Sequence, residues 1–243
     1  MDCFTKRELR MSSLSICTIC QDEAEVLPEF LESCKFIADS LKEDFKELVI
    51  VDGGSKDTSV EIIKSYQDKM PIVLIEYPFD TFGQQKNRAL ERATGDFILG
   101  IDADMTITTN FPQLFKTGYF QAACMWDFML YFTARDKYHH FKWPPGYTMR
   151  LWKRGPLFIT NFHEKLQGQY PGVPSCPEVT IFENSFRQSE EALLNRGRRY
   201  QRFQKEMSEA GGGPGDELRY LNASKAPDSE IAEIPAHVCK YIL

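Results

Sequence analysis

Two carboxylates, Asp102 and Asp104, follow a short apolar segment in the sequence DFILGIDADMT, residues 96–106. A continuous apolar run of this length is typical of a strand that is buried on both faces, which predicts a central strand of a parallel sheet. Open α/β sheets bind ligands beyond the carboxyl ends of their strands, where these two side chains would lie. We therefore expect a site in which Asp102 and Asp104 hold Mg²⁺ or Mn²⁺ against a diphosphate. The alternative is a pair of solvated loop carboxylates.

Asp52 ends a second apolar run, ELVIVD, and is followed by Gly53 and Gly54. Glycines allow the backbone to approach a ligand closely, and a carboxylate at a strand end suits hydrogen bonding to a nucleotide base or ribose. The alternative is an ordinary turn, because Asp-Gly-Gly-Ser is common loop chemistry.

His163 and Glu164 form a third cluster, in the sequence FHEKL. If a hairpin folds this pair back to the acidic pair, the imidazole can complete a metal shell and Glu164 can act as a general base. A structural histidine is the alternative, since the second His of a zincin motif is missing. Asp127, in CMWDF, is the substitute candidate for the base, and its alternative is a strand residue with a buried partner.

The elements that must position these residues alternate between strand and helix. Apolar runs predict strands at residues 14–20, 47–52, 72–76 and 96–101, and the segments between them have helical spacing or composition, the second reaching to about Met70. Such alternation predicts right-handed crossovers and an α/β fold with a mainly parallel central sheet and helices on both faces. After residue 104 we expect a helix near residues 111–120, long strands and hairpins, and then a polar helix over residues 189–210.

The same pattern predicts how the chain is organised. We expect an N-terminal extension at residues 1–12 and one domain at residues 13–210, which divides into a nucleotide-binding half (13–104) and an acceptor half (105–210). The sequence GGGPG, residues 211–215, ends the polar helix, and residues 211–243 are predicted to be a C-terminal tail or a strap over the domain.

Composition excludes several classes of protein. The net charge of −6 over 243 residues argues against broad electrostatic binding to nucleic acid. No window has the roughly 18 apolar residues of a membrane span, so we expect a soluble protein, either free in the cytoplasm or peripheral at a membrane. The 7 cysteines are odd in number and scattered, which does not suggest a disulfide framework. The Cys17-x-x-Cys20 pair is predicted to be buried in the first strand.

The motifs in their order closely resemble the family 2 glycosyltransferases of GT-A fold, above all the soluble transferases that modify lipopolysaccharide cores or peptides. The resemblance extends over residues 13–205 and rests on ICQDEAEVL, IVDGGSKDTS, FGQQKNRALERATGDFILGIDADM, YTMRLWKRG and FHEKL. It implies a GT-A fold, a divalent metal and a nucleoside-diphosphate sugar, with a UDP-sugar favoured. It also implies transfer to a hydroxyl of a glycan, lipid-linked glycan or protein, with inversion at the anomeric carbon.

The resemblance also implies roles for individual residues. Glu164 would be the base, Asp102, Asp104 and His163 would face the metal, and Arg150 would steady the site or the phosphates. The nucleotide-sugar would contact Thr18 and Cys20 through their backbone, Glu23, Asp52, Gly53, Gly54, Gln84, Lys86, Arg88, Asp102 and Ala103.

The chain departs from the family pattern at two places. Met105 stands where similar proteins often have Glu, and Glu183 and Asn184 stand where they often have His. Met105 keeps open the alternative of a nucleotide-sugar binding protein without turnover. DADMT also matches the D-x-D-x-T motif of haloacid dehalogenase-like phosphatases, whose nucleophile usually lies on the first core strand. Here three strand–helix units precede the acidic pair, which disfavours the phosphatase.

Overall fold

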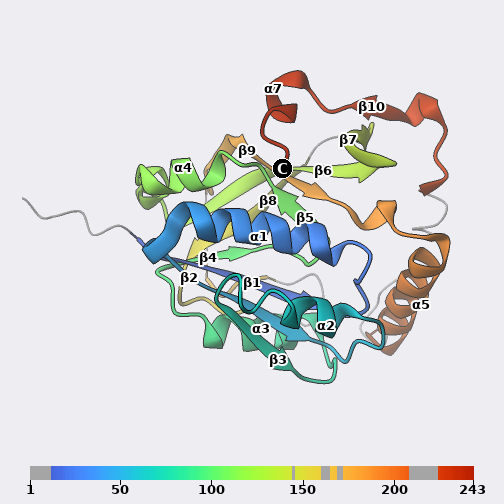
Figure 1. Cartoon of the computed structure of the whole chain (residues 1–243), viewed down its shortest axis with the longest axis horizontal. Coiled ribbons are helices and arrows are strands. Elements are labelled where there is room, and N and C mark those ends of the chain that lie inside the picture. Colours follow the sequence, from blue (N-terminus) through green and yellow to red (C-terminus); the bar gives the residue numbers. More distant parts are fainter. Residues whose placement is uncertain (1–11, 144–145, 160–164, 169–171, 208–223) are drawn as a thin grey trace, which may run out of the picture.

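The computed structural model describes residues 12–143, 146–159, 165–168, 172–207 and 224–243 (Figure 1). In the first half, strands alternate with helices. The elements are β1 Leu14–Cys20, α1 Leu27–Leu41, η1 Lys42–Asp44, β2 Phe45–Asp52, α2 Ser59–Lys64, β3 Ile72–Glu76, α3 Phe82–Arg92 and β4 Phe97–Gly100. The four strands expected from the apolar runs are therefore confirmed.

The second half begins directly after the acidic pair and is dominated by strands. Its elements are β5 Met105–Ile107, α4 Phe111–Lys116, η2 Tyr119–Ala122, β6 Met125–Ala134, β7 Asp136–Phe141, β8 Gly146–Lys153, β9 Ser175–Glu183, η3 Ser185–Arg187, α5 Glu190–Met207, η5 Asp228–Glu230, β10 Ile231–Glu233 and α7 Ala236–Cys239. The expected long strands, hairpin and polar helix are confirmed.

One sheet connects the two halves. The strands of its main path follow the order β10-β7-β6-β8-β4-β1-β2-β3, and β9 pairs with both β5 and β6. Strands β4, β1, β2 and β3 are mutually parallel, whereas β8 is antiparallel to β4. The parallel register places Cys20 opposite Asp52 and Cys17 opposite Gly100. The loops that follow β1, β2 and β4 consequently leave the sheet at the same edge.

Helices cover both faces of the parallel part, as expected. On one face, α1 and α4 pack through residues such as Phe30 and Phe111 against the larger hydrophobic cluster. On the other face, Ala89 and Leu90 of α3 pack with Trp152 of β8. The side chains of the central strands are buried on both sides, which explains why their sequences are continuous apolar runs.

Two helices are shorter than the sequence predicts. Helix α2 ends at Lys64 rather than near Met70, and the Ser65 hydroxyl there donates to the carbonyl of Ile62 at 2.7 Å. Helix α4 ends at Lys116 because Gly118 adopts a left-handed conformation with φ 78°, a common helix stop. At α5 the predicted cap is present, since the Ser189 hydroxyl accepts a hydrogen bond from the amide of Ala192 at 3.3 Å.

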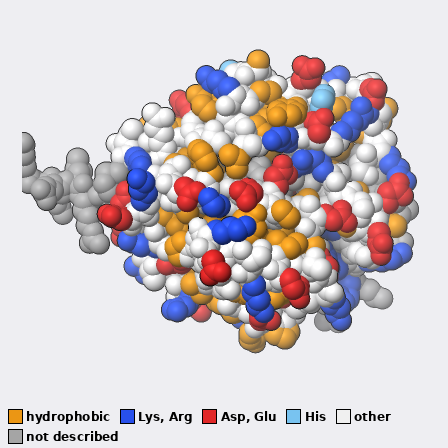
Figure 2. All heavy atoms as spheres, in the orientation of Figure 1, with side chains coloured by type: hydrophobic (Ala, Val, Ile, Leu, Met, Phe, Trp, Pro, Cys, Tyr) orange, Lys and Arg blue, Asp and Glu red, His pale blue; other side chains and the backbone are white. Residues whose placement is uncertain are grey.

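Residues 224–243 pack on the second half of the sheet. Strand β10 pairs with β7, and Ile234 and Val238 are buried against Phe182 of β9. The segment therefore has the position of a strap, while residues 211–223 lie outside the described part of the chain. The viewed face of the molecule carries acidic and basic side chains that are interspersed rather than gathered in one block (Figure 2). Within the described ranges, no helix is long and apolar enough to cross a membrane.

Candidate nucleotide and cation site

A cavity of about 520 Å³ lies at the carboxyl ends of β1 and β4. Its walls come from β1 and the following loop, α3, the turn after β4, β8 and α5. Parallel pairing explains why these segments converge, because it brings the ends of β1 and β4 to one edge of the sheet. The cavity is where the sequence places the nucleotide site.

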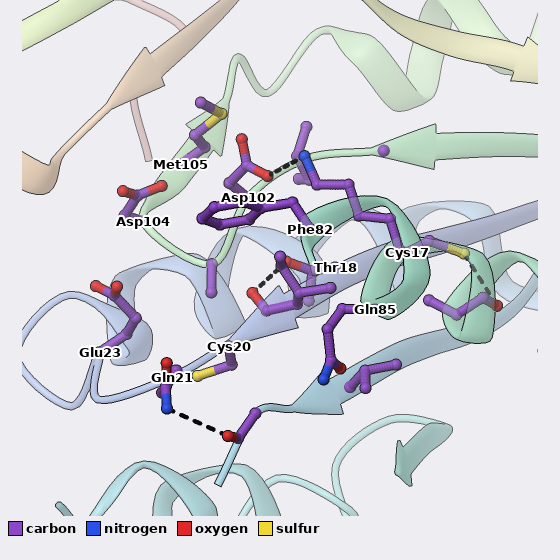
Figure 3. A pocket seen from close by; sticks show the side chains of 18 of the residues that line it. Cys17, Thr18, Cys20, Gln21, Glu23, Phe82, Gln85, Asp102, Asp104 and Met105 are labelled. Carbon is purple, nitrogen blue, oxygen red and sulfur yellow. Dashed lines mark hydrogen bonds and ion pairs between the residues drawn. The ribbon is translucent and has the colours of Figure 1, made fainter. Parts of the chain in front are cut away.

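Asp102 and Asp104 project into this cavity from the turn that follows β4 (Figure 3). The amide of Met105 donates to the carbonyl of Asp102 at 2.9 Å, which closes the turn. On the far side, the amide of Asn184 donates to the carbonyl of Asp104 at 2.8 Å. The acidic pair is thus fixed between the last parallel strand and β9.

Two cations neutralise Asp102. The Lys86 ammonium lies 3.3 Å from one carboxylate oxygen, and a guanidinium nitrogen of Arg150 lies 3.1 Å from the other. Burial alone would raise the pKa of Asp102, but the charges of Lys86 and Arg150 outweigh it and hold the pKa well below its usual range. Asp102 is therefore a carboxylate at any physiological pH.

Asp104 is more deeply buried than Asp102, and only one of its two carboxylate oxygens has a hydrogen-bond partner among the described residues. The residue is 6% exposed, and its Oδ2 accepts a hydrogen bond from Arg196 at 2.9 Å. Its Oδ1 is buried without a hydrogen-bond partner among the described residues. A buried carboxylate oxygen without a partner is the kind of acceptor that a hard cation satisfies, so the acidic pair fits the predicted metal.

The predicted third metal ligand and the predicted base, His163 and Glu164, lie outside the described residues. Across the described ranges, no three His, Cys, Asp or Glu side chains are grouped in a way that could hold a metal ion by themselves. The cation role of Asp102, Asp104 and His163 remains a prediction.

Glu23 closes the cavity on the side of α5. It lies in the loop after β1, is 8% exposed, and accepts hydrogen bonds from Arg196 at 2.6 Å and from Gln188 at 2.8 Å. One turn further along α5, Arg199 donates to Asp22 at 2.8 Å. The loop predicted to contact the base and ribose is therefore tied to α5.

Glu183, at the end of β9, also lines the cavity. Burial and the neighbouring charge of Asp104 raise its pKa to about 8. Glu183 lies directly opposite Met105 in the β5–β9 pair, and its carboxylate accepts a hydrogen bond from Ser185 at 2.8 Å. In the sequence, this position stands out only as the place of a missing His. The usable signal was an acidic residue at the end of an apolar run.

Other predicted residues also lie in the cavity wall. Thr18 and Cys20 are buried in β1, and the carbonyl of Cys20 accepts a hydrogen bond from the amide of Gly53 at 2.8 Å. The predicted residues that line the cavity are Thr18, Cys20, Glu23, Gly53, Lys86, Asp102, Ala103, Asp104 and Arg150.

Asp52 does not line the cavity, and its carboxylate forms hydrogen bonds within the turn that follows β2. Its Oδ2 accepts hydrogen bonds from the amides of Gly54 and Ser55 at 2.9 and 3.0 Å, which is the loop chemistry named as the alternative. A contact between Asp52 and a base would need to share these oxygens, and it remains a prediction.

Four further predicted residues are not brought into the cavity wall, namely Gly54, Gln84, Arg88 and Asp127. Arg88 forms an ion pair with Asp80 at 2.6 Å and stacks over the ring of Tyr77, and Gln84 lies on the exposed part of α3. Asp127 of β6 likewise lies outside the lining, although burial raises its pKa.

Comparison with known proteins gives a family for this arrangement. The model of the family described as "Glycosyl transferase family 2" matches residues 15–168. A TPR repeat-containing protein of Synechococcus elongatus is 37% identical over 94 residues, which are 39% of this chain and 21% of that protein. The lipopolysaccharide core biosynthesis glycosyltransferase LpsC of Rhizobium meliloti is 35% identical over 102 residues, 42% of this chain and 35% of that protein. The chain therefore spans between a fifth and about a third of the length of these relatives.

A solved structure agrees on the fold. A mannosyltransferase of Pyrobaculum calidifontis, solved in complex with GDP-Man and Mn²⁺, superposes with a TM-score of 0.56 over 90% of this chain and 70% of that chain, at 16% identity. The family model covers both the loop after β1 and the turn after β4, the two segments that carry Glu23, Asp102 and Asp104. The chain belongs to glycosyl transferase family 2.

Proposed function

We propose that the protein transfers a sugar from a nucleoside diphosphate to an acceptor hydroxyl, with inversion at the anomeric carbon and with a divalent cation at Asp102 and Asp104. The observation that carries this proposal is the acidic turn itself. It lies at the carboxyl end of β4 inside a cavity of about 520 Å³, and Oδ1 of Asp104 has no partner among the described residues. The family match supports sugar transfer and gives no support to the phosphatase alternative.

The basic and the acidic residues of the site have different roles. Lys86 and Arg150 keep Asp102 ionised and fix its orientation, so that it presents a carboxylate to the ribose and the cation. Asp104 offers its unpartnered oxygen to the same cation. When bound, Mn²⁺ or Mg²⁺ stabilises the negative charge that develops on the leaving diphosphate.

Transfer forms a bond between the acceptor oxygen and the anomeric carbon as the bond from that carbon to the diphosphate oxygen breaks. The proton of the acceptor hydroxyl passes to a general base, for which Glu164 is proposed and Asp127 is the substitute. A UDP-sugar is the proposed donor. The proposed acceptor is a hydroxyl of a glycan, a lipid-linked glycan or a protein. We place the reaction in the cytoplasm, either free or at the surface of a membrane.

The test replaces Asp104, whose Oδ1 has no hydrogen-bond partner among the described residues. Asp104→Ala is expected to abolish Mn²⁺-dependent hydrolysis of the donor and transfer, because it removes the oxygen that no group in the described part of the chain satisfies. The wild type should also be stabilised in a thermal-shift assay by UDP-sugar with Mn²⁺, by about 2.7 kcal/mol at a ligand concentration 100 times the Kd. GDP- and dTDP-sugars serve as competing donors in the same assay.

Asp39→Ala is the matched control, since Asp39 is an exposed acid on α1 that pairs only with Lys35 in the described contacts. The control should keep both the stabilisation and the activity. Unchanged donor hydrolysis in Asp104→Ala would contradict the proposed role of a cation at Asp104. If no nucleotide-sugar stabilises the wild type, the proposal of sugar transfer is wrong.

A further inference from the structure

Arg196 is a buried cation at the place where the proposed metal would act. Its guanidinium donates to Oδ2 of Asp104 at 2.9 Å and to Oε2 of Glu23 at 2.6 Å, and its side chain is 7% exposed. The two acidic partners are almost as deeply buried, with side chains 8% and 11% exposed. Arg196 lies on α5, beyond the residues 15–168 that the family model matches.

This cation and a divalent metal would share one carboxylate. A charge that is buried without a counter-ion is costly, so Arg196 and Asp104 hold each other in place in the metal-free protein. A divalent ion at Oδ1 of Asp104 would stand a few ångströms from the guanidinium, and like charges at that separation repel each other strongly outside bulk water. The repulsion therefore weakens the binding of both cations to Asp104.

We propose that Arg196 is a positioning residue that occupies Asp104 in the absence of metal and competes with the divalent cation for it. The inference rests on the proposed function, because the cation is the one assigned there to Asp104. Its consequence is that metal alone binds weakly, whereas metal that arrives with a diphosphate brings the negative charge that offsets the repulsion. The site would then fill in one step with donor and cation together.

The competition is reciprocal, because two ligands that weaken each other do so by the same factor. Metal that binds to Asp104 must loosen the hold of Arg196 on that residue, and through it the docking of α5. Both directions can be measured, one on a variant and one on the wild type.

The first experiment measures binding of Mn²⁺ alone, without nucleotide, by electron paramagnetic resonance of the free ion. Arg196→Gln removes the charge and keeps an amide donor for Glu23. It is expected to bind Mn²⁺ about tenfold more tightly than the wild type, which corresponds to about 1.4 kcal/mol.

Arg199→Gln is the matched control. Arg199 lies one turn away on the same helix and pairs with Asp22 and Glu23, at 2.8 and 3.5 Å, and within the described part of the chain it forms no ion pair with Asp104. Loss of a partly exposed ion pair changes little, so the affinity of this variant for Mn²⁺ should remain within about twofold of the wild type.

The second experiment needs no substitution and decides the matter if Arg196→Gln does not fold. Hydrogen exchange of the α5 amides in residues 190–202 is expected to become faster when Mn²⁺ alone is added to the wild type. Unchanged protection of α5 would overturn the competition, as would Mn²⁺ affinity in Arg196→Gln that is equal to or weaker than that of the wild type. If neither the wild type nor the variant binds Mn²⁺, the metal assignment of the proposed function fails as well, so the two failures are distinguishable.

Discussion

Asp102 and Asp104 are separated by one residue, yet their surroundings differ. Asp102 is held by Lys86 and Arg150 from α3 and β8, whereas Asp104 is held by Arg196 from α5. The first carboxylate is therefore fixed within the family domain, and the second is tied to a helix beyond it. A substitution of Asp102 therefore tests contacts within the family domain, whereas a substitution of Asp104 also tests the contact with α5.

Arg150 provides the prediction at this scale. Arg150→Met removes the 3.1 Å hydrogen bond to Asp102 and leaves Lys86, among the described residues, as the remaining cation in contact. A hydrogen bond to a charged group contributes about 1.5–3 kcal/mol, so kcat/KM for the donor should fall by roughly ten- to a hundredfold. Steady-state kinetics with varied donor concentration measure the loss.

Arg154→Met is the control for the loss of an arginine that is close to Arg150 in the sequence. Arg154 follows β8 and donates to the carbonyl of Gly95 at 2.9 Å, at the opposite end of β4 from the acidic pair. Its donor kinetics should match the wild type. Equal losses in both variants would mean that Arg150 acts through general stability and not through Asp102.

The residues that can be predicted from the sequence are those whose partners lie in recognisable motifs. Lys86, Arg150 and Asp102 were all predicted for the site, and the structure places them in contact. Arg196 was missed because its partners are 92 and 173 positions away, and no local spacing reports such a distance. The only trace is the run RGRRY, in which Arg196 and Arg199 are three apart and so share one face of a helix.

At the scale of the elements, β4 depends on close contact with β1 at the start of the strand. Gly95 precedes β4, and its amide donates to the hydroxyl of Ser15 at 2.7 Å. A Cβ at Gly95 would lie 2.5 Å from the backbone nitrogen of Ser15, which cannot move without disturbing β1. Helix α3 already ends at Arg92, so the close contact with β1, and not the end of a helix, is the stronger constraint on Gly95.

Gly95→Ala should therefore destabilise the fold by about 1–3 kcal/mol, the usual range for overpacking, as measured by chemical unfolding. Gly146→Ala is the comparison at the start of β8, where an added Cβ meets nothing within 4 Å. That variant should stay within about 0.5 kcal/mol of the wild type. A Gly95→Ala protein as stable as Gly146→Ala would show that β1 and β4 can separate at low cost.

The elements of the first half could be predicted because each strand is a short, continuous apolar run between polar segments. The ends of α2 and α4 could not, because hydrogen bonding by Ser65 and the left-handed conformation of Gly118 decide them locally. The pairing of β9 with both β5 and β6 was also beyond the sequence, since strands far apart in the chain carry no mark of their neighbours.

At the scale of the whole molecule, the last residues of the chain belong to the fold. Ile234 is 2% exposed and packs with Val238 against Phe182 of β9, the strand that ends at Glu183. The sequence predicts a tail or a strap here, because residues 224–243 have few periodic signals. Burial against β9 is what gives this segment its place.

Ile234→Ala should lower the free energy of unfolding by about 2–5 kcal/mol through the cavity that it leaves. Ile159→Ala is the control, because Ile159 is 65% exposed. Equilibrium unfolding in urea compares the two. If Ile234→Ala is as stable as the control, residues 224–243 do not contribute to the cooperative unit.

The contact between Asp104 and Arg196 can form only late in the synthesis of the chain. The two residues are 92 positions apart, so at roughly 5–20 residues per second the ribosome makes Asp104 about 5–20 seconds before its partner. Throughout that interval the parallel strands can already form, but Asp104 has no guanidinium beside it. The nascent chain therefore passes through a stage in which its acidic turn is open to cations from the solution, and the arrival of α5 closes that stage.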